Sequence, residues 1–159
     1  MAKAKVYGLD EYSKLISQAS KEVEHIVDTS IYAGANIIAD SIKDGIRGLR
    51  TSGRSEWETR KREKQKQGLM ESFGIAKMQD DHGFRNVKIG FDGYNEVKTK
   101  SFPNGQPNVM VARIFNSGTS FSSKQPFFDK AVRATRSTAK QKMIEVAEKE
   151  LEKIAKEKE

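Results

Sequence analysis

A chain of 159 residues can bury one hydrophobic core but not two, so we expect a single domain over residues 1–159. The absence of cysteine excludes disulfides, thiolate metal sites and cysteine nucleophiles. No apolar run approaches the roughly 20 residues that cross a bilayer, and no apolar stretch follows the N-terminal lysines as in a secretory signal. We therefore expect a soluble protein made in the cytoplasm, with no membrane contact.

The positive charge is concentrated in one segment of twenty residues. Of the net charge of +7, this segment supplies +5, from eight Lys or Arg residues and three Glu. A local concentration of this kind predicts one surface that faces a polyanion. The eight basic residues are Arg47, Arg50, Arg54, Arg60, Lys61, Arg62, Lys64 and Lys66.

The N-terminal part of the chain has the period of a long amphipathic helix. Apolar residues recur at spacings of three and four from Leu9 to Ile37, and the stripe then shifts by one residue and continues to Ile46. A continuous helix over this range would be roughly 55 Å long, more than the width of a compact domain of this size. We expect either a break near Gly34 or Gly45, or an end that projects and packs on a neighbour.

The basic insertion, at about 47–67, has helix-boundary signals but almost no apolar residues. Ser55 and Glu58 have the Ser-x-x-Glu spacing of a capping box, and Gly68 fits a C-terminal stop. Trp57 is the one large apolar residue between them, and a helix that is polar all round cannot be stabilised by core burial. Three forms stay open: a mobile loop, a helix formed only on assembly, and an arm that binds anions.

Short strand signals follow and predict an α+β fold. Strands near Ile75, Val87 and Val109 would form a small antiparallel sheet packed against a long N-terminal helix and a C-terminal helix. The segment at about 92–108 contains an Asp-Gly and an Asn-Gly dipeptide, which are strong turn signals. We expect it to form a long irregular hairpin connection.

The stretch "VMVARIF", which begins at Val109, is apolar on both faces apart from Arg113. A strand of this composition is normally covered on both sides. The long helix can supply one cover, and we expect a second subunit to supply the other. Met110, Ala112 and Ile114 are the corresponding candidates for a subunit or neck interface.

The connection before the C-terminal helix ends in an apolar pair. Gly118 lets a pliable loop, Ser117 to Ser123, change direction, and the fixed φ of Pro126 suits the first turn of a helix. Two adjacent residues on a helix point about 100° apart, so Phe127 and Phe128 cannot fill the same pocket. We expect Phe127 to pack in the core and Phe128 to contact a neighbouring subunit.

Catalytic signatures are absent from the sequence. Asp80, Asp81 and His82 could hold a divalent metal and serve a small nuclease, but Asp and Gly are also the residues that a tight turn requires. His25 lies beside the apolar stripe of the first helix, and no serine stands in a Gly-x-Ser-x-Gly elbow. We expect no enzymatic activity, no cofactor and no metal.

An ordered set of segments resembles the tail-completion, or head–tail joining, proteins of long-tailed bacteriophages. The segments are "YGLDEYSKLI", "GLMESFGIAKM", "NVKIGFDGY", "VARIFNSGTS" and "QPFFDKAV", and they extend over roughly Gly8 to Ala147. The most specific part combines an aromatic residue, a Gly-Thr-Ser, a basic spacer and a Pro-Phe before the last helix. Here these are Phe115, Gly118-Thr119-Ser120, Lys124 and Pro126-Phe127. The basic insertion departs from the family, which has a Pro-x-x-Thr-Gly segment after its first helix.

This resemblance implies a structural virion protein. Proteins of the family form a ring, commonly six-fold, at the head-proximal end of the tail, where they complete the tail tube and join it to the connector. The expected partners are thus copies of the chain itself, the tail tube protein and the head–tail connector proteins. The implied location is the head–tail junction of the virion, and a tail terminator and a head-side joining protein both stay open. Within the motif, the candidate contact residues are Gly118, Thr119 and Ser120.

The basic segment supports an alternative, a sequence-independent DNA-binding accessory protein. Trp57 is the only aromatic residue in the segment, so platforms for base stacking are lacking. Contacts would therefore go to phosphates. In a ring, the same residues could face DNA in the lumen.

Overall fold

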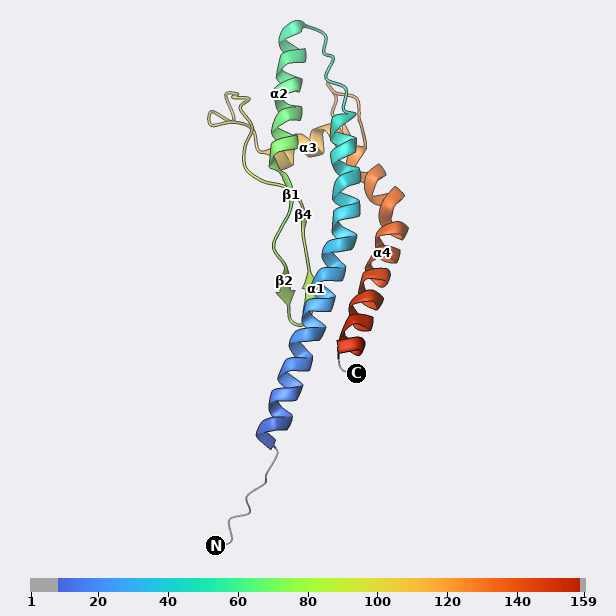
Figure 1. Ribbon diagram of the computed structural model, residues 1–159. Coiled ribbons are helices and arrows are strands. Elements are labelled where there is room, and N and C mark those ends of the chain that lie inside the picture. Colours follow the sequence, from blue (N-terminus) through green and yellow to red (C-terminus); the bar gives the residue numbers. More distant parts are fainter. Residues whose placement is uncertain (1–8, 158–159) are drawn as a thin grey trace.

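The computed structural model describes the backbone of residues 9–157 and the side chains of residues 16–156. Two long helices form its spine: α1 (Leu9–Arg47) and α4 (Phe127–Glu157) lie antiparallel side by side (Figure 1). A shorter helix, α2 (Glu56–Ser72), runs in the direction opposite to α1; its C-terminal part lies beside the last turns of α1 and its N-terminal part extends beyond them. The mixed class, α+β with two long packed helices and a small antiparallel β region, confirms the expected fold class.

Helix α1 is continuous, so the first of the two alternatives, a break near Gly34 or Gly45, does not occur. Both glycines lie where α4 comes closest: a Cβ on Gly34 would be 2.5 Å from Cγ of Met143, and one on Gly45 would be 3.1 Å from Cβ of Phe127. The first part of α1 extends past the end of α4 (Figure 1). On α1, Ile16 and Val23 are more than half exposed. The stripe positions Leu9 and Tyr12 fall outside the described side chains.

The β region consists of two small antiparallel pairs. Strand β1 (Phe73–Ile75) pairs with β4 (Ile89–Phe91), with Phe73 opposite Phe91, and β2 (Gln79–Asp81) pairs with β3 (Phe84–Asn86) as a hairpin. The strands expected near Ile75 and Val87 are thus present in part, since β4 begins two residues after Val87.

The strand expected at Val109 is wrong, because Asn108–Ser117 forms helix α3. Its buried residues are Asn108, Val111, Ala112 and Phe115, a helical spacing that brings one face to the core, whereas Val109 is 61% exposed. Pro107 precedes the helix and Gly118 ends it with φ 75°, so both ends carry the usual boundary residues.

The hydrophobic core lies where the upper half of α1, α2, α3 and the start of α4 meet. Ile42, Ile46, Leu69 and Val111 are completely buried, and each comes from α1, α2 or α3. Leu69 explains why α2 forms despite its polar composition: a few residues near its C-terminal end anchor it. Gly68 does not end the helix as expected. Its missing side chain leaves room for Asn95, whose Cβ would be 2.5 Å from an added Cβ.

The connection between β4 and α3 is irregular, as expected, but well anchored. A bridge joins Tyr94 to Pro107, and the amide N–H of Asn95 donates to the carbonyl of Gln106 at 2.9 Å. Gly105 has φ 110°, and a Cβ there would be 2.1 Å from the carbonyl oxygen of Asn95. No helix among the described residues is long and apolar enough to cross a bilayer.

Candidate functional site

The loop between α3 and α4 is folded by its own hydrogen bonds. Thr119 and Ser122 pair through two backbone bonds of 2.9 and 3.2 Å, and the amide N–H of Phe121 donates to Oγ1 of Thr119 at 3.3 Å. Gly118 has φ 75° and donates to the carbonyl of Ile114 at 2.9 Å. The expectation of a pliable loop therefore needs correction: a tight turn closes around Ser120 and Phe121. We call residues 118–122 the display turn.

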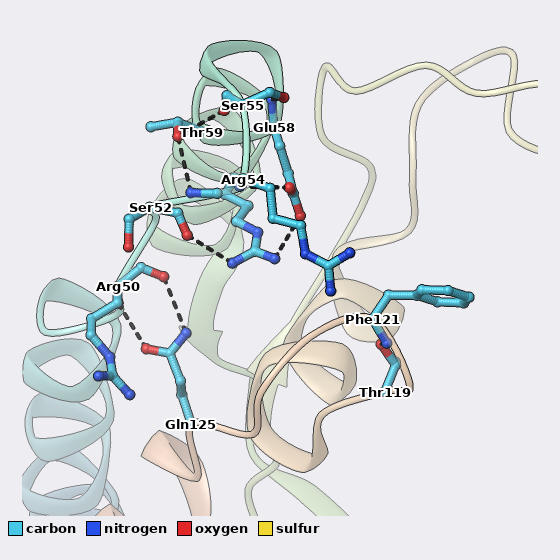
Figure 2. Close-up of polar contacts among 11 residues, drawn as sticks. Arg50, Ser52, Arg54, Ser55, Glu58, Thr59, Thr119, Phe121 and Gln125 are labelled. Atoms are coloured by element: carbon cyan, nitrogen blue, oxygen red, sulfur yellow. Dashed lines mark hydrogen bonds and ion pairs between the residues drawn. The ribbon is translucent and has the colours of Figure 1, made fainter.

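Gln125 anchors the end of this loop to a segment far away in the sequence. Its backbone N–H donates to the carbonyl of Phe115 at 2.7 Å. Its side-chain oxygen accepts from the N–H of Arg50 at 2.8 Å, and its side-chain nitrogen donates to the carbonyl of Arg50 at 3.1 Å (Figure 2). The side-chain amide of Gln125 thus forms the pair of hydrogen bonds with Arg50 that a residue of a neighbouring β-strand would form. It joins the α3–α4 loop to the α1–α2 connection.

The display turn presents an aromatic ring to solvent. The ring of Phe121 points away from Gln125 and Arg50 (Figure 2), and the residue is 80% exposed, the largest value among the exposed large hydrophobic residues described. Sequence reasoning did not select Phe121. A lone aromatic residue in a serine-rich loop has no periodicity, and its exposure depends on the turn that holds it.

The start of α4 is capped by α3. Oδ1 of Asn116 accepts from the backbone N–H groups of Phe128 at 3.1 Å and Asp129 at 3.3 Å, and Nδ2 of Asn116 donates to Oδ2 of Asp129 at 2.9 Å. The helix starts directly after Pro126, as expected. These bonds satisfy free amide groups in the first turn and fix α4 against the end of α3.

The two adjacent phenylalanines at this helix start have different surroundings. Phe127 is 6% exposed and belongs to the core, as expected. Phe128 is half-buried at the edge of the core. Both rings contact Phe91, with centroid distances of 6.3 Å for Phe127 and 6.4 Å for Phe128. Phe128 therefore has contacts within its own chain and retains an exposed edge.

An open apolar cavity of about 380 Å³ lies beside that edge. We call it the α3 pocket. Its apolar side chains come from β4, α3 and the start of α4, and Arg113, Asn116 and Ser117 also line it. The apolar side chains are those of Ile89, Phe91, Val109, Ala112 and Phe128.

The helical form of α3 changes the candidate interface residues. Met110 and Ile114 are one turn apart and half-buried, whereas Ala112 is 7% exposed and lies in the core. Ala112 lies on the core side of α3 and contributes to the surface only as part of the lining of the α3 pocket. Thr119 and Ser120 lie in the exposed display turn, and Gly118 is half-buried at its base.

From Glu56 on, the basic segment belongs to helix α2, whose N-terminal signals are confirmed. Oγ of Ser55 accepts from the backbone N–H of Glu58 at 3.2 Å. The Glu58 carboxylate reaches one residue beyond the usual capping-box position and accepts from the N–H of Arg54 at 2.8 Å. This hydrogen bond, followed by the attraction of the Arg62 guanidinium, holds the pKa of Glu58 below its ordinary value.

Two basic side chains of α2 stabilise the α1–α2 connection. Arg62 donates to the carbonyl of Ser52 at 3.0 Å and to Glu58 at 2.8 Å. Nζ of Lys66 donates to the carbonyls of Arg47 at 2.6 Å and Leu49 at 3.1 Å, so its charge lies at the C-terminal end of α1. A cation there favours the helix dipole.

Most of the other basic residues in the segment also have partners. Arg47 pairs with Asp44, Arg60 with Glu56 and Lys64 with Glu96, while Nζ of Lys61 lies 5.3 Å from the ring centroid of Trp57. The two remaining basic residues of the segment, Arg50 and Arg54, are exposed and form no ion pair with another described residue. Fewer cations are therefore free for phosphate groups than the sequence predicts.

A groove of about 500 Å³ at the junction of α1, the loop and α4 has a cationic rim. Arg50, Lys124 and Lys130 line it together with small residues such as Gly45 and Gly48. No acidic side chain lines this groove. It adjoins the display turn through Lys124 but is separate from the α3 pocket.

The acidic residues considered for metal binding serve the β2–β3 hairpin. Oδ1 of Asp80 accepts from the N–H of Gly83 at 2.7 Å, and Oδ2 of Asp81 accepts from Nδ2 of Asn86 at 3.0 Å. His82 has φ 55° within the turn. No group of three metal-ligating residues occurs in the part of the chain that the structure describes.

The hairpin is tied to α1 by an ion pair. Nε of Arg85 donates to Oδ1 of Asp28 at 2.6 Å, and a terminal nitrogen of the same guanidinium contacts Oδ2. This two-bond pair raises the pKa of Arg85 above its ordinary value. The hairpin is therefore held against α1.

Sequence reasoning also missed a buried amide network under the β4–α3 connection. Nε2 of Gln65 donates to Oε1 of Gln106 at 2.6 Å, and Nδ2 of Asn108 donates to the carbonyl of Asp92 at 2.9 Å. Gln65, Gln106 and Asn108 are each less than 10% exposed. The available signal was the number of Asn and Gln residues in the segment at about 92–108. The turn dipeptides of the same segment indicated a surface loop instead.

Comparisons of the chain with protein-family models, with curated proteins and with solved structures each found no match.

Proposed function

We propose that this chain is a structural virion protein of a tailed phage, without enzymatic activity. It forms a ring, six-fold in this proposal, at the head-proximal end of the tail, completes the tail tube and joins it to the head connector. The proposal takes its role from the family resemblance.

One observation carries the proposal: the most specific residues of the resemblance form a single structural unit. Phe115 is 3% exposed and its carbonyl accepts from Gln125, while Gly118 provides the positive φ that begins the display turn. Pro126 immediately precedes α4, and Phe127 fills the core beneath it. A motif that builds one loop supports a shared fold and role more strongly than scattered matches would.

The distribution of apolar surface is compatible with a protein that assembles. Phe121, Val109, Ile16 and Val23 are each more than half exposed, and they come from three separate regions of the chain. Apolar side chains exposed in several places suit a subunit that contacts neighbours on more than one face. The projecting start of α1 agrees with the expectation that it packs on another molecule.

Location in the particle is the decisive test. Antibody labelling of purified virions is expected to mark the neck between head and tail, and phage that lack the gene are expected to accumulate unjoined heads and tails. An untagged copy supplied in trans should restore joining, which controls for effects on neighbouring genes. Absence of the protein from virions, together with normal particles from the gene-deleted phage, would contradict the proposal.

A further inference from the structure

Phe121 is an apolar side chain fixed in an exposed position. The display turn closes beneath it through the paired backbones of Thr119 and Ser122, and Gln125 fixes the end of the loop on Arg50. Its ring therefore does not fold down onto the chain, and the residue is 80% exposed. A side chain presented by a rigid turn loses little conformational entropy on binding, which favours association.

The α3 pocket has the size and lining that a phenyl ring requires. A cavity of about 150 Å³ lined by apolar side chains can hold benzene, and the α3 pocket measures about 380 Å³. Val109 at its edge is 61% exposed and Phe128 is half-buried. Both therefore have apolar surface left to bury. Arg113 and Ser117 provide polar groups around this apolar centre, the usual arrangement of a protein interface.

Both halves of this contact are present on one chain as adjoining but distinct patches, since Ser117 lines the α3 pocket and Gly118 begins the display turn. The chain's own loop is bonded at Gly118, Thr119 and Gln125 in a position that leaves Phe121 exposed. A contact between two different patches of identical subunits is heterologous, and repeated heterologous contacts produce a ring when the rotation closes. A second copy is thus the occupant whose geometry agrees with a ring.

We propose that Phe121 of one subunit inserts into the α3 pocket of the next subunit, against Val109 and Phe128, and joins the subunits head to tail. This inference rests on the proposed function, because it assigns the contact that would build the ring. Full burial of one phenyl ring strengthens an association by about ten- to hundred-fold. Phe121→Ala is therefore expected to weaken self-association by about that factor.

The absence of cysteine allows a direct cross-linking test. Two single variants, Ser120→Cys beside Phe121 and Arg113→Cys at the edge of the pocket, keep both Phe121 and Val109. They are purified in reduced form, mixed and oxidised mildly. A disulfide-linked dimer containing one of each chain is expected to form at least about ten times faster than in the control mixture. The control pairs Ser120→Cys with Phe84→Cys, because Phe84 is 78% exposed on the distant β2–β3 hairpin.

A second measurement tests the pocket without cysteine. Val109→Glu places a charge at the edge of the pocket, and since Val109 is exposed, the fold should tolerate it. Light scattering should show weaker association for Val109→Glu and for Phe121→Ala. The double variant should associate no more weakly than the single variant with the weaker association, because both changes remove the same contact.

Two outcomes would overturn the head-to-tail contact. One is an equal rate of cross-linking in the test and control mixtures; the other is a Ser120→Cys homodimer as the main product, which would indicate a two-fold contact. These outcomes are separable from failure of the proposed function. A neck location combined with equal rates removes only this contact, whereas rapid cross-linking by a protein absent from virions removes only the virion role.

Discussion

The side chain of Gln125 pairs with the backbone of Arg50 in both directions, accepting at 2.8 Å and donating at 3.1 Å. The two residues are 75 positions apart. The pair connects the end of α1 to the loop that carries the display turn. The position of Phe121 thus depends on where α1 ends as well as on its own loop.

Gln125→Ala should destabilise the protein by about 1–2 kcal/mol, since it removes two hydrogen bonds of roughly 1 kcal/mol each. Gln125→Glu should behave similarly at neutral pH, because a carboxylate oxygen would replace the donor that faces the carbonyl of Arg50. Urea denaturation gives the free energies of unfolding. Gln141→Ala, at an exposed position of α4, is the control. If Gln125→Glu matches the wild type at neutral pH, the donated hydrogen bond contributes nothing.

Gly34→Ala should destabilise the α1–α4 pair by about 1–3 kcal/mol, the usual cost of overpacking. The added Cβ would lie 2.5 Å from Cγ of Met143 and 3.2 Å from the carbonyl oxygen of Ala139. Adding Met143→Ala should recover part of the loss, and the remainder should reflect the carbonyl. A double-mutant cycle measures this coupling.

The control for this prediction is Gly48→Ala, whose Cβ would have only 3.6 Å contacts. It should change stability by no more than about 0.5 kcal/mol. If the losses in free energy of unfolding from Gly34→Ala and Met143→Ala are strictly additive, the added methyl group is accommodated by separation of the two helices and not by movement of the Met143 side chain.

Glu58→Gln should remove a pH-dependent part of the stability of α2. Because the folded pKa of Glu58 lies below the ordinary value of 4.5, the carboxylate stabilises the fold above about that pH. This contribution is lost as the pH falls through the lowered pKa. The difference in Tm between wild type and Glu58→Gln should therefore narrow below pH 4.5.

Ser55→Ala serves as the control for the pH experiment. It removes the hydroxyl that caps α2, at a cost of about 1 kcal/mol, and a hydroxyl does not titrate in this range. Its Tm deficit should stay constant with pH. If the Tm deficit of Glu58→Gln is also constant with pH, the pKa of Glu58 does not differ between the folded and unfolded chains, which contradicts the prediction.

Long periodic segments were predictable from the sequence because many residues share one repeat. The stripe from Leu9 to Ile46 gave α1, and the Ser55–Glu58 spacing gave the start of α2. The helix at Val109 was not predictable, since its six apolar residues fit a buried strand or a helix equally well. Pro107 and Gly118, ten residues of helix apart, were the unused signal.

The candidate site was predictable only in part. Phe127 and Pro126 follow from local rules, because a proline suits a helix start and one of two adjacent aromatic residues must face inward. The exposure of Phe121 depends on contacts between Gln125 and Arg50, which no local pattern encodes. The partners of Lys66 are likewise backbone carbonyls whose position follows from how α1 and α2 pack.

The last prediction separates the two phenylalanines at the start of α4. Phe127→Ser should cost about 3–5 kcal/mol, because it empties a core position and buries a hydroxyl there. Phe128→Ser should cost less, about 1–2 kcal/mol, since its ring is only half-buried and one edge is already in solvent. Thermal unfolding of the monomer measures both.

Phe128→Ser should nevertheless weaken self-association, because Phe128 lines the α3 pocket. Phe127→Ser has no such direct effect on the pocket lining, so any loss of association should follow its loss of folded protein. Light scattering at a temperature where both variants remain folded distinguishes the two cases. Equal falls in Tm, or unchanged association of folded Phe128→Ser, would mean that the two rings share one role in the core.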